Sequence, residues 1–151
     1  MENFNHPILI PIPLSAKRYK ERGYNQAELI CKELIRLSKT NHLTPPLDSL
    51  GAPLSLIRRG AGGEVFTLEN NILIKPKETE HQARILNREK RLKNIVGSFA
   101  IKNAEENISK IKNRNIILID DITTTGATLT EAKKILKKNG ARKVIAFTIA
   151  H

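Results

Sequence analysis

Short apolar runs alternate along this chain with segments of helical periodicity. Four of these runs, residues 8–12, 72–74, 116–119 and 144–149, are rich in β-branched residues and end at turn-forming or charged positions, which is typical of buried strands. Apolar residues recur every three or four positions over residues 25–38 and 128–139, which predicts two amphipathic helices. Strands that alternate with helices predict an α/β fold, with a mainly parallel sheet flanked by helices.

The last predicted helix has the clearest boundaries. Its lysines face away from the apolar stripe and lie near the negative end of the helix dipole. Gly140 follows as a residue that adopts the left-handed conformation easily and ends the helix. Local structure therefore accounts for this segment without a functional role for its basic residues, which are Lys133, Lys134, Lys137 and Lys138.

Residues 41–71 differ from the rest of the chain, because proline and glycine crowd a segment with no sustained period. The segment is predicted to be a long loop or an insertion, and unstructured connections of this length are either functional or incidental. A chain of 151 residues is long enough for one domain with a core and short for two. Residues 1–151 are therefore predicted to form a single domain.

The composition is that of an ordinary folded protein, with 40% hydrophobic and 27% charged residues. No apolar run approaches the roughly 20 residues of a membrane-spanning helix. The first residues also lack the pattern of a secretory signal, so the cytoplasm is the expected location. Cys31 is the only cysteine, and the four histidines have no metal-ligand spacing, so we expect no structural metal.

The net charge of +11 favours an anionic partner, either a nucleic acid or a phosphorylated metabolite. An equally weighted alternative is that the lysines reflect compositional bias and line solvated faces. Charge alone informs about partners and does not decide the fold.

One strand–loop–helix stretch carries the most informative chemistry. The predicted strand at residues 116–119 ends in two aspartates, after which a threonine-rich loop leads into the last helix. A strand that turns directly into a helix presents unpaired backbone N–H groups and the positive end of the helix dipole to an anion. Glycine allows the turn, and the threonine hydroxyls add donors. The predicted phosphate-binding residues are Thr123, Thr124, Thr125, Gly126, Ala127 and Thr128.

Asp120 and Asp121 need a different ligand group, because two adjacent carboxylates repel a phosphate. As hydrogen-bond acceptors at a strand end they suit the 2′ and 3′ hydroxyls of a ribose. A Mg²⁺ ion nearby would tie the sugar to a diphosphate. The stretch therefore predicts a site for a ribose 5-phosphate activated at C1; the alternative is a plain strand-to-helix turn with surface acids.

The sequence IILIDDITTTGATL resembles the phosphoribosyl-pyrophosphate motif of type I phosphoribosyltransferases almost letter for letter. The chain has no Walker-type P-loop, and the glycines near residue 60 do not complete a dinucleotide fingerprint. The resemblance implies the type I phosphoribosyltransferase fold and a pentosyltransferase reaction, in which a phosphoribosyl group passes from phosphoribosyl pyrophosphate to an acceptor. It also implies catalytic roles for Asp120 and Asp121 and a Mg²⁺ ion bridged by the substrate.

The upstream stretch IPIPLSAKRYKERGYNQAELI resembles the ComF family of competence-associated, phosphoribosyltransferase-like proteins. In that family the equivalent segment is a strand end, a basic loop and a helix. The resemblance implies that the first part of the loop binds the diphosphate and that the second part lines the mouth of the site. These residues are Ser15, Ala16, Lys17 and Arg18, and then Arg22, Asn25 and Gln26. The alternative is a basic surface loop in which Asn25 only caps the helix.

A third stretch, EHQARILNREKRLKNIVGSF, is strongly basic and also resembles the ComF pattern. In related transferases this region is a lid. A basic lid over a diphosphate leaving group stabilises charge as the C1–O bond breaks and excludes water. The resemblance thus implies catalytic roles for Arg88 and Arg91, whereas the alternative is a solvated helix face.

The favoured interpretation is an enzyme of this family, with phosphoribosyl pyrophosphate or a nucleotide as its ligand. The ComF resemblance also links the chain to competence, DNA uptake and DNA as a partner, and a homodimer fits the transferase resemblance. Family members usually carry an amino-terminal zinc-ribbon module, which this sequence lacks. Two alternatives therefore stay open: a non-catalytic nucleotide sensor or DNA-uptake accessory protein, and a truncated inactive remnant.

Overall fold

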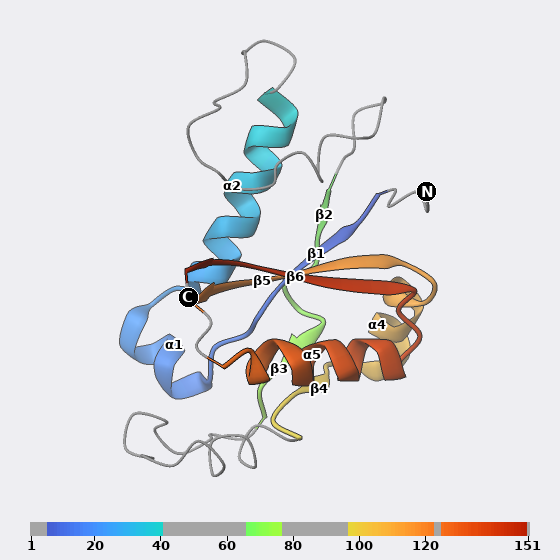
Figure 1. Cartoon of the computed structure of the whole chain (residues 1–151). Helices are drawn as coiled ribbons and strands as arrows, with labels where there is room; N and C mark the ends of the chain where they lie inside the picture. Colours follow the sequence, from blue (N-terminus) through green and yellow to red (C-terminus); the bar gives the residue numbers. More distant parts are fainter. Residues whose placement is uncertain (1–5, 41–65, 77–96, 123–124, 151) are drawn as a thin grey trace.

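The computed structural model describes residues 6–40, 66–76, 97–122 and 125–150. Their main feature is a sheet in the order β2-β1-β5-β6, in which all three strand pairs are parallel (Figure 1). The strands are β2 (Thr67–Leu68), β1 (Ile8–Pro11), β5 (Asn115–Ile122) and β6 (Lys143–Ala150). The predicted α/β fold with a mainly parallel sheet is confirmed.

The side chains of β1 and β5 alternate between two apolar layers. Ile10 and Leu118 belong to one layer, whereas Leu9 and Ile119 belong to the other, and all four are almost completely buried. The helices α4 (Ala104–Ile111) and α5 (Ala127–Lys138) supply apolar residues to the first layer, and α2 (Gln26–Thr40) supplies them to the second. A parallel strand covered on both faces needs apolar residues at every position, which explains the continuous runs in the sequence.

The predicted strand at residues 72–74 lies outside the main sheet. Its residues form β3 (Leu73–Ile74), which pairs antiparallel with β4 (Ala100–Ile101) in a separate two-stranded sheet. Ile72 and Leu73 still pack into the core beside α5, so burial was predicted correctly. The expectation that this strand alternates within the parallel sheet is wrong, because strand partners are chosen by contacts distant in the sequence.

Helix α1 (Ala16–Arg22) occupies a segment that was expected to be a loop. The Ser15 side chain accepts a hydrogen bond from the backbone N–H of Arg18 at the start, and Gly23, with φ 77°, ends the helix in the left-handed conformation. No residue of α1 is buried. The helix therefore has no apolar stripe from which periodicity could reveal it.

The predicted last helix corresponds to α5, which begins one residue earlier than expected. Gly140 has φ 93° and follows the end of the helix, as predicted, and the four lysines are exposed. Strand β2 lies within the segment that was expected to be a long loop, and residues 41–65 of that segment lie outside the described residues. No helix in the described part of the chain is long and apolar enough to cross a membrane.

Replacing Leu136 with alanine should destabilise the fold strongly. Its side chain is fully buried between α5 and the sheet, so the substitution removes apolar contacts and leaves a cavity. We expect the free energy of unfolding in urea to fall by about 2–5 kcal/mol. Leu29→Ala on the exposed side of α2 is the matched control, with an expected change below about 0.5 kcal/mol. Equal losses in the two variants would contradict the assignment of the core.

Candidate functional site

The carboxyl ends of β1 and β5 lie side by side at one edge of the sheet. The backbone N–H of Ile12 donates to the carbonyl oxygen of Ile119 over 2.8 Å, so the parallel pairing continues to the last apolar residue of β5. Asp120 and Asp121 follow directly, where the strand leaves the core and becomes partly exposed. Polar side chains that cannot enter the core therefore gather at the edge where ligands bind in α/β sheets.

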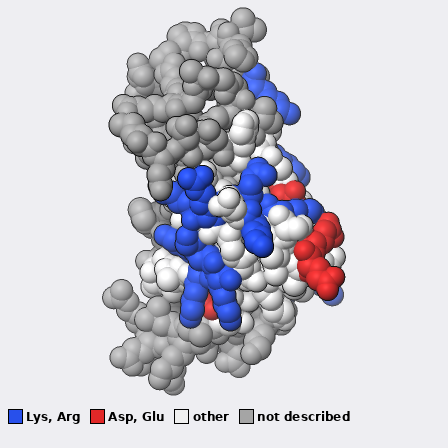
Figure 2. All heavy atoms as spheres, turned by 90° about the vertical axis from the view of Figure 1, so that its right-hand side faces the viewer, with Lys and Arg blue, Asp and Glu red and all other residues white. Residues whose placement is uncertain are grey.

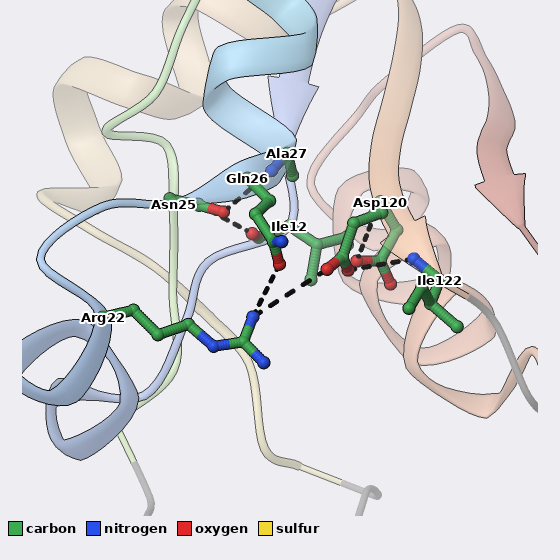
Figure 3. A network of polar contacts seen from close by, with 8 residues as sticks. Ile12, Arg22, Asn25, Gln26, Ala27, Asp120 and Ile122 are labelled. Atoms are coloured by element: carbon green, nitrogen blue, oxygen red, sulfur yellow. Dashed lines mark hydrogen bonds and ion pairs between the residues drawn. The ribbon is translucent and has the colours of Figure 1, made fainter.

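Arg22 connects the end of α1 with this strand end (Figure 3). Its Nη1 atom lies 3.9 Å from Oδ2 of Asp121 and donates a hydrogen bond of 2.6 Å to Oε1 of Gln26. The guanidinium therefore lies between the first turn of α2 and the aspartates. The Arg22 and Asp121 side chains keep 45% and 29% of their accessible surface, so the ion pair is open to solvent and to a ligand.

Asp120 is partly buried and has an unusual protonation equilibrium. Its Oδ1 atom accepts a hydrogen bond of 3.0 Å from the backbone N–H of Asp121. The pKa of Asp120 is raised to about 7, first by burial and then by the hydrogen bond with the Asp121 side chain, although the Asp121 N–H and the positive charge of Lys75 act in the opposite direction. Near neutral pH this carboxyl group is poised between its charged and neutral forms.

Lys75 is a site residue that the sequence reasoning missed. It directly follows β3 and is partly buried, with its Nζ atom 5.7 Å from the centre of the Phe99 ring. Burial lowers the pKa of Lys75, the nearby positive charge of Arg18 lowers it further, and Asp120 partly offsets both. A lysine at the end of a predicted strand is the available signal, but local sequence does not show which residues that strand end meets.

Asn25 contributes two hydrogen bonds to the fold. Its Oδ1 atom accepts a hydrogen bond of 3.1 Å from the N–H of Ala27, which caps α2. Its Nδ2 atom donates over 3.0 Å to the carbonyl oxygen of Ile12 at the end of β1. The amide therefore caps α2, as the sequence predicted, and also holds the start of α2 against the end of β1.

The loop after β5 leads into α5 through a left-handed glycine. Gly126 has φ 69° and occupies the N-cap position, and no side chain caps the helix there. A Cβ atom added to Gly126 would meet nothing within 4 Å, so the positive φ, and not a close approach, is what requires glycine. Thr125 Oγ1 accepts only a long contact of 3.5 Å from the N–H of Ala127. The first turn of α5 therefore has donors to offer an anion.

The remaining predicted residues fall into two groups. Ser15, Ala16, Lys17 and Arg18 form the start of α1, where Ser15 is the N-cap and the other three are exposed. Within the described residues no ion pair joins Lys17 to the aspartates, whereas Arg18 acts on Lys75 electrostatically. Thr128 and Ala127 lie in the first turn of α5. Four predicted site residues lie outside the described residues: Arg88, Arg91, Thr123 and Thr124.

Three kinds of group thus meet at one edge of the sheet, and we name them together the strand-end site. Asp120 and Asp121 provide acceptors, Arg18, Arg22 and Lys75 provide positive charge, and the amino end of α5 provides backbone donors. Acceptors suit sugar hydroxyls, whereas cations and helix amides suit phosphate oxygens. A ligand that carries both a sugar and separate phosphate groups satisfies all three.

The chain is similar to phosphoribosyl transferase domains and to competence proteins. A family model described as "Phosphoribosyl transferase domain" matches residues 72–151. "Competence protein ComFC" of Bacillus subtilis (strain 168) is 37% identical over 145 residues, which cover 95% of this chain and 44% of that protein. "Competence protein F" of Haemophilus influenzae is 29% identical over 142 residues, covering 94% of this chain and 49% of the relative.

A third similar protein is named for DNA. "DNA utilization protein YhgH" of Escherichia coli O157:H7 is 26% identical over 136 residues, which cover 90% of this chain and 45% of that protein. The chain thus spans about half the length of the curated relatives that it matches.

The Asp120 carboxyl group should titrate near neutral pH. A ¹³C NMR titration of the side-chain carboxyl is expected to show a midpoint at about 7, and a midpoint near 4 would contradict the burial argument. Because the unfolded chain holds this proton with a pKa of roughly 3.9, the folded state binds it more tightly. The contribution of Asp120 to stability is therefore full below about pH 4 and is lost as the pH rises through about 7.

The dependence of folding stability on the protonation of Asp120 can also be tested by mutation. Asp120→Asn keeps the shape of the neutral carboxyl group and cannot ionise. Urea unfolding should show the variant more stable than the original chain at pH 8 and close to it at pH 4, because only the charged form is penalised by burial. A stability difference that does not change between the two pH values would contradict this assignment.

Proposed function

This chain belongs to the phosphoribosyl transferase domain family and, within it, to the ComF group, and we propose that it binds phosphoribosyl pyrophosphate at the strand-end site and transfers the phosphoribosyl group. Its mainly parallel sheet is of the type I phosphoribosyltransferase kind. The observation that carries the proposal is the meeting of two carboxylates, a cluster of cations and an uncapped helix amino end at one edge of the sheet.

The acidic pair is proposed to hold the ribose. Asp120 and Asp121 have carboxylate oxygens that accept hydrogen bonds from vicinal hydroxyls, such as those at C2 and C3. Each carboxylate already receives one backbone N–H, from Asp121 and Ile122 respectively, at 3.0 and 2.9 Å. These bonds orient the two groups while leaving oxygen lone pairs for a ligand, so the sugar finds a preorganised pair of acceptors.

The 5-phosphate is proposed to lie at the start of α5. The loop from Thr125 enters the helix through Gly126, and in the first turn only the N–H of Ala127 has a side-chain partner, at a long 3.5 Å from Thr125 Oγ1. A dianionic phosphate at this point satisfies the unpaired donors and interacts favourably with the helix dipole. The Thr125 and Thr128 hydroxyls supply further donors.

The diphosphate is proposed to face the three cations. Arg22 comes from the end of α1, Arg18 from its beginning and Lys75 from the end of β3. Burial and the positive charge of Arg18 lower the pKa of Lys75, and a diphosphate bound between the two cations would offset their repulsion. Charge-assisted bonds of this kind contribute roughly 1.5–3 kcal/mol each.

The residues also fit a Mg²⁺ ion that is held mainly by the substrate. Within the described residues no three His, Cys, Asp or Glu side chains gather as metal ligands, whereas the strand end carries two adjacent carboxylates. Such a pair suits an ion that keeps most of its ligands from diphosphate and water. When bound, the ion would neutralise charge on the diphosphate leaving group.

The transfer proposed here needs little acid–base chemistry from the protein. The C1–O bond breaks, both electrons leave with the diphosphate, and a nucleophile forms the new bond at C1. Positioning and electrostatic stabilisation account for most of such a rate enhancement. Arg18, Arg22 and Lys75 would stabilise the departing charge, while Asp120 and Asp121 hold the ribose in place and stabilise positive charge on its ring.

The relatives suggest the biological setting. Two of the similar proteins are named as competence proteins and another as a DNA utilization protein. We propose that this chain serves the uptake or use of DNA, and that its phosphoribosyl chemistry or nucleotide binding supports that process.

Titration calorimetry tests the site directly. Phosphoribosyl pyrophosphate should bind with a micromolar dissociation constant in the presence of Mg²⁺ and much more weakly without it. The double variant Asp120→Asn with Asp121→Asn should lose most of this binding, because amides are poorer acceptors for hydroxyls and do not attract Mg²⁺. The matched control is Glu105→Gln with Glu106→Gln on α4, which removes the same charge outside the strand-end site.

Two results would separate the hypotheses. If the folded protein gives no heat with phosphoribosyl pyrophosphate and Mg²⁺, the proposed site is wrong. If it binds the ligand but never releases diphosphate when nucleobases and other acceptors are added, a nucleotide-sensing role replaces the enzyme.

Lys75→Met tests the cation that completes the site. Methionine keeps the apolar stem beside Phe99 and removes the charge, so we expect the dissociation constant for phosphoribosyl pyrophosphate to rise by about 10-fold or more. Lys39→Met on the exposed end of α2 should change it less than about twofold. Undiminished affinity in Lys75→Met would exclude this lysine from the diphosphate site.

A further inference from the structure

One carboxylate of this molecule is buried instead of lying on the surface. Figure 2 shows the Lys, Arg, Asp and Glu side chains of one face lying on its surface, where water solvates them. Glu131, in the second turn of α5, keeps only 8% of its accessible surface, and it is the only buried charged residue among those that the structure describes. Burying a carboxylate is costly unless polar groups bind it, so the identity of its partner is informative.

The partner of Glu131 is the backbone just before β4. The N–H of Gly97 donates a hydrogen bond of 2.8 Å to Oε1 of Glu131. Phe99 follows two residues later, is almost completely buried, and belongs to the same apolar layer as Leu129 and Ala132 of α5. Helix α5 therefore holds this short segment both by a hydrogen bond and by apolar packing.

Phe99 in turn supports Lys75. Strands β3 and β4 pair antiparallel with Ile74 opposite Ala100, so Lys75 and Phe99 are the next pair in this register. The Nζ atom of Lys75 lies 5.7 Å from the centre of the Phe99 ring, within the range of a cation–π interaction. The position of the ammonium group therefore depends on where Phe99 is held.

We propose that Glu131 is a positioning residue for Lys75 and acts through Gly97 and Phe99. The inference rests on the proposed function, in which Lys75 binds the diphosphate. A lysine side chain has much conformational entropy to lose when it is ordered, and a lysine that is already held in place loses less of it when a ligand binds. Because Glu131 is buried, it contributes to affinity without touching the ligand.

The hydrogen bond also links the two proposed phosphate positions. Glu131 lies four residues after Ala127, which begins α5 and lies where the 5-phosphate is proposed to bind. Four residues of α-helix rise by only about 6 Å. The helix that receives the 5-phosphate therefore also fixes the segment that supports Lys75, and so sets the spacing between the 5-phosphate and the diphosphate.

A second buried polar side chain holds the other end of the same strand pair and provides a matched control. Asn107 of α4 is 4% exposed, and its Nδ2 atom donates to the carbonyl oxygens of Asn71 and Lys102. The N–H of Lys102 donates to the carbonyl oxygen of Ile72 over 2.9 Å, at the end of the pair away from Lys75. Asn107→Ala therefore removes buried hydrogen bonds to the same small sheet without removing the support of Lys75.

Titration calorimetry of phosphoribosyl pyrophosphate with Mg²⁺ tests the inference through a double-mutant cycle. Glu131→Ala should raise the dissociation constant about 5-fold in the original chain but less than about twofold in the Lys75→Met background, where no ammonium group is left to position. Glu131→Gln keeps an oxygen acceptor for the Gly97 N–H and should stay within about twofold of the original. Asn107→Ala should also stay within about twofold.

Proton NMR of the protein without ligand reports the position of Lys75 directly. The ring current of Phe99 should shift the ε-CH₂ resonances of Lys75 upfield of those of exposed lysines, and their loss in Lys75→Met identifies them. They should move toward the exposed-lysine values in Glu131→Ala and stay in place in Glu131→Gln and Asn107→Ala. Thermal unfolding shows whether each variant is folded. If Glu131→Ala is not, Glu131→Asp replaces it, because the shorter side chain withdraws the carboxylate from Gly97, and the same shifts are expected.

Three results would overturn the inference: Lys75 resonances that do not move when Glu131 is changed, affinity losses from Glu131→Ala and Lys75→Met that simply add, or equal losses in Glu131→Ala and Asn107→Ala. A failure of the proposed function is distinguishable from these. In that case the original chain does not bind phosphoribosyl pyrophosphate, and the role of Glu131 in binding falls with it, whereas the NMR comparison still shows whether Glu131 places Lys75.

Discussion

The parallel pairing of β1 with β5 is the constraint on which the rest of this structure depends. From Ile116 to Ile119, β5 is buried between α2 on one face and α4 and α5 on the other. Such a strand accepts only apolar side chains, so polar groups can follow only where it leaves the core. Asp120 and Asp121 stand at that point, and the N–H of Ile12 bound to Ile119 brings the end of β1 to the same place. The site is therefore a consequence of where burial stops.

The electrostatics of the strand-end site follow from an unequal burial of its charges. Burial and a nearby like charge raise the pKa of Asp120 and lower the pKa of Lys75. Both changes favour the neutral form of the group. Arg22, which is exposed, forms only a long ion pair with Asp121. A ligand whose hydroxyls bind the acids and whose phosphates bind the cations would offset the electrostatic cost of burying both sets of charges. Exposed ion pairs provide little free energy of this kind.

The two edges of the sheet have different electrostatic characters. At the carboxyl edge, acids and cations are interleaved and partly buried, which suits a small ligand with mixed chemistry. At the amino edge, Lys112, Arg114 and Arg142 lie on two turns that backbone hydrogen bonds join. The net charge of +11 therefore has more than one origin: some cations belong to the strand-end site, and others form a separate surface.

The sequence alone determined the strands β1, β5 and β6 through their apolar runs, and the helices α2 and α5 through their helical periods. It also determined the acidic end of β5 through its two adjacent aspartates and the glycine that follows the strand. Each of these features is encoded in neighbouring residues. Exposed α1 and the antiparallel pairing of β3 with β4 could not be predicted in this way, since α1 buries no side chain and strand pairing joins residues distant in the chain. For the same reason, only the tertiary structure decided that Lys75 lies near Asp120 and Arg18. It also decided that Asn25 donates a hydrogen bond to the end of β1, and that the turns around Lys112 and Arg142 meet. Local patterns decide what a segment becomes, whereas the contacts between segments decide which charges meet.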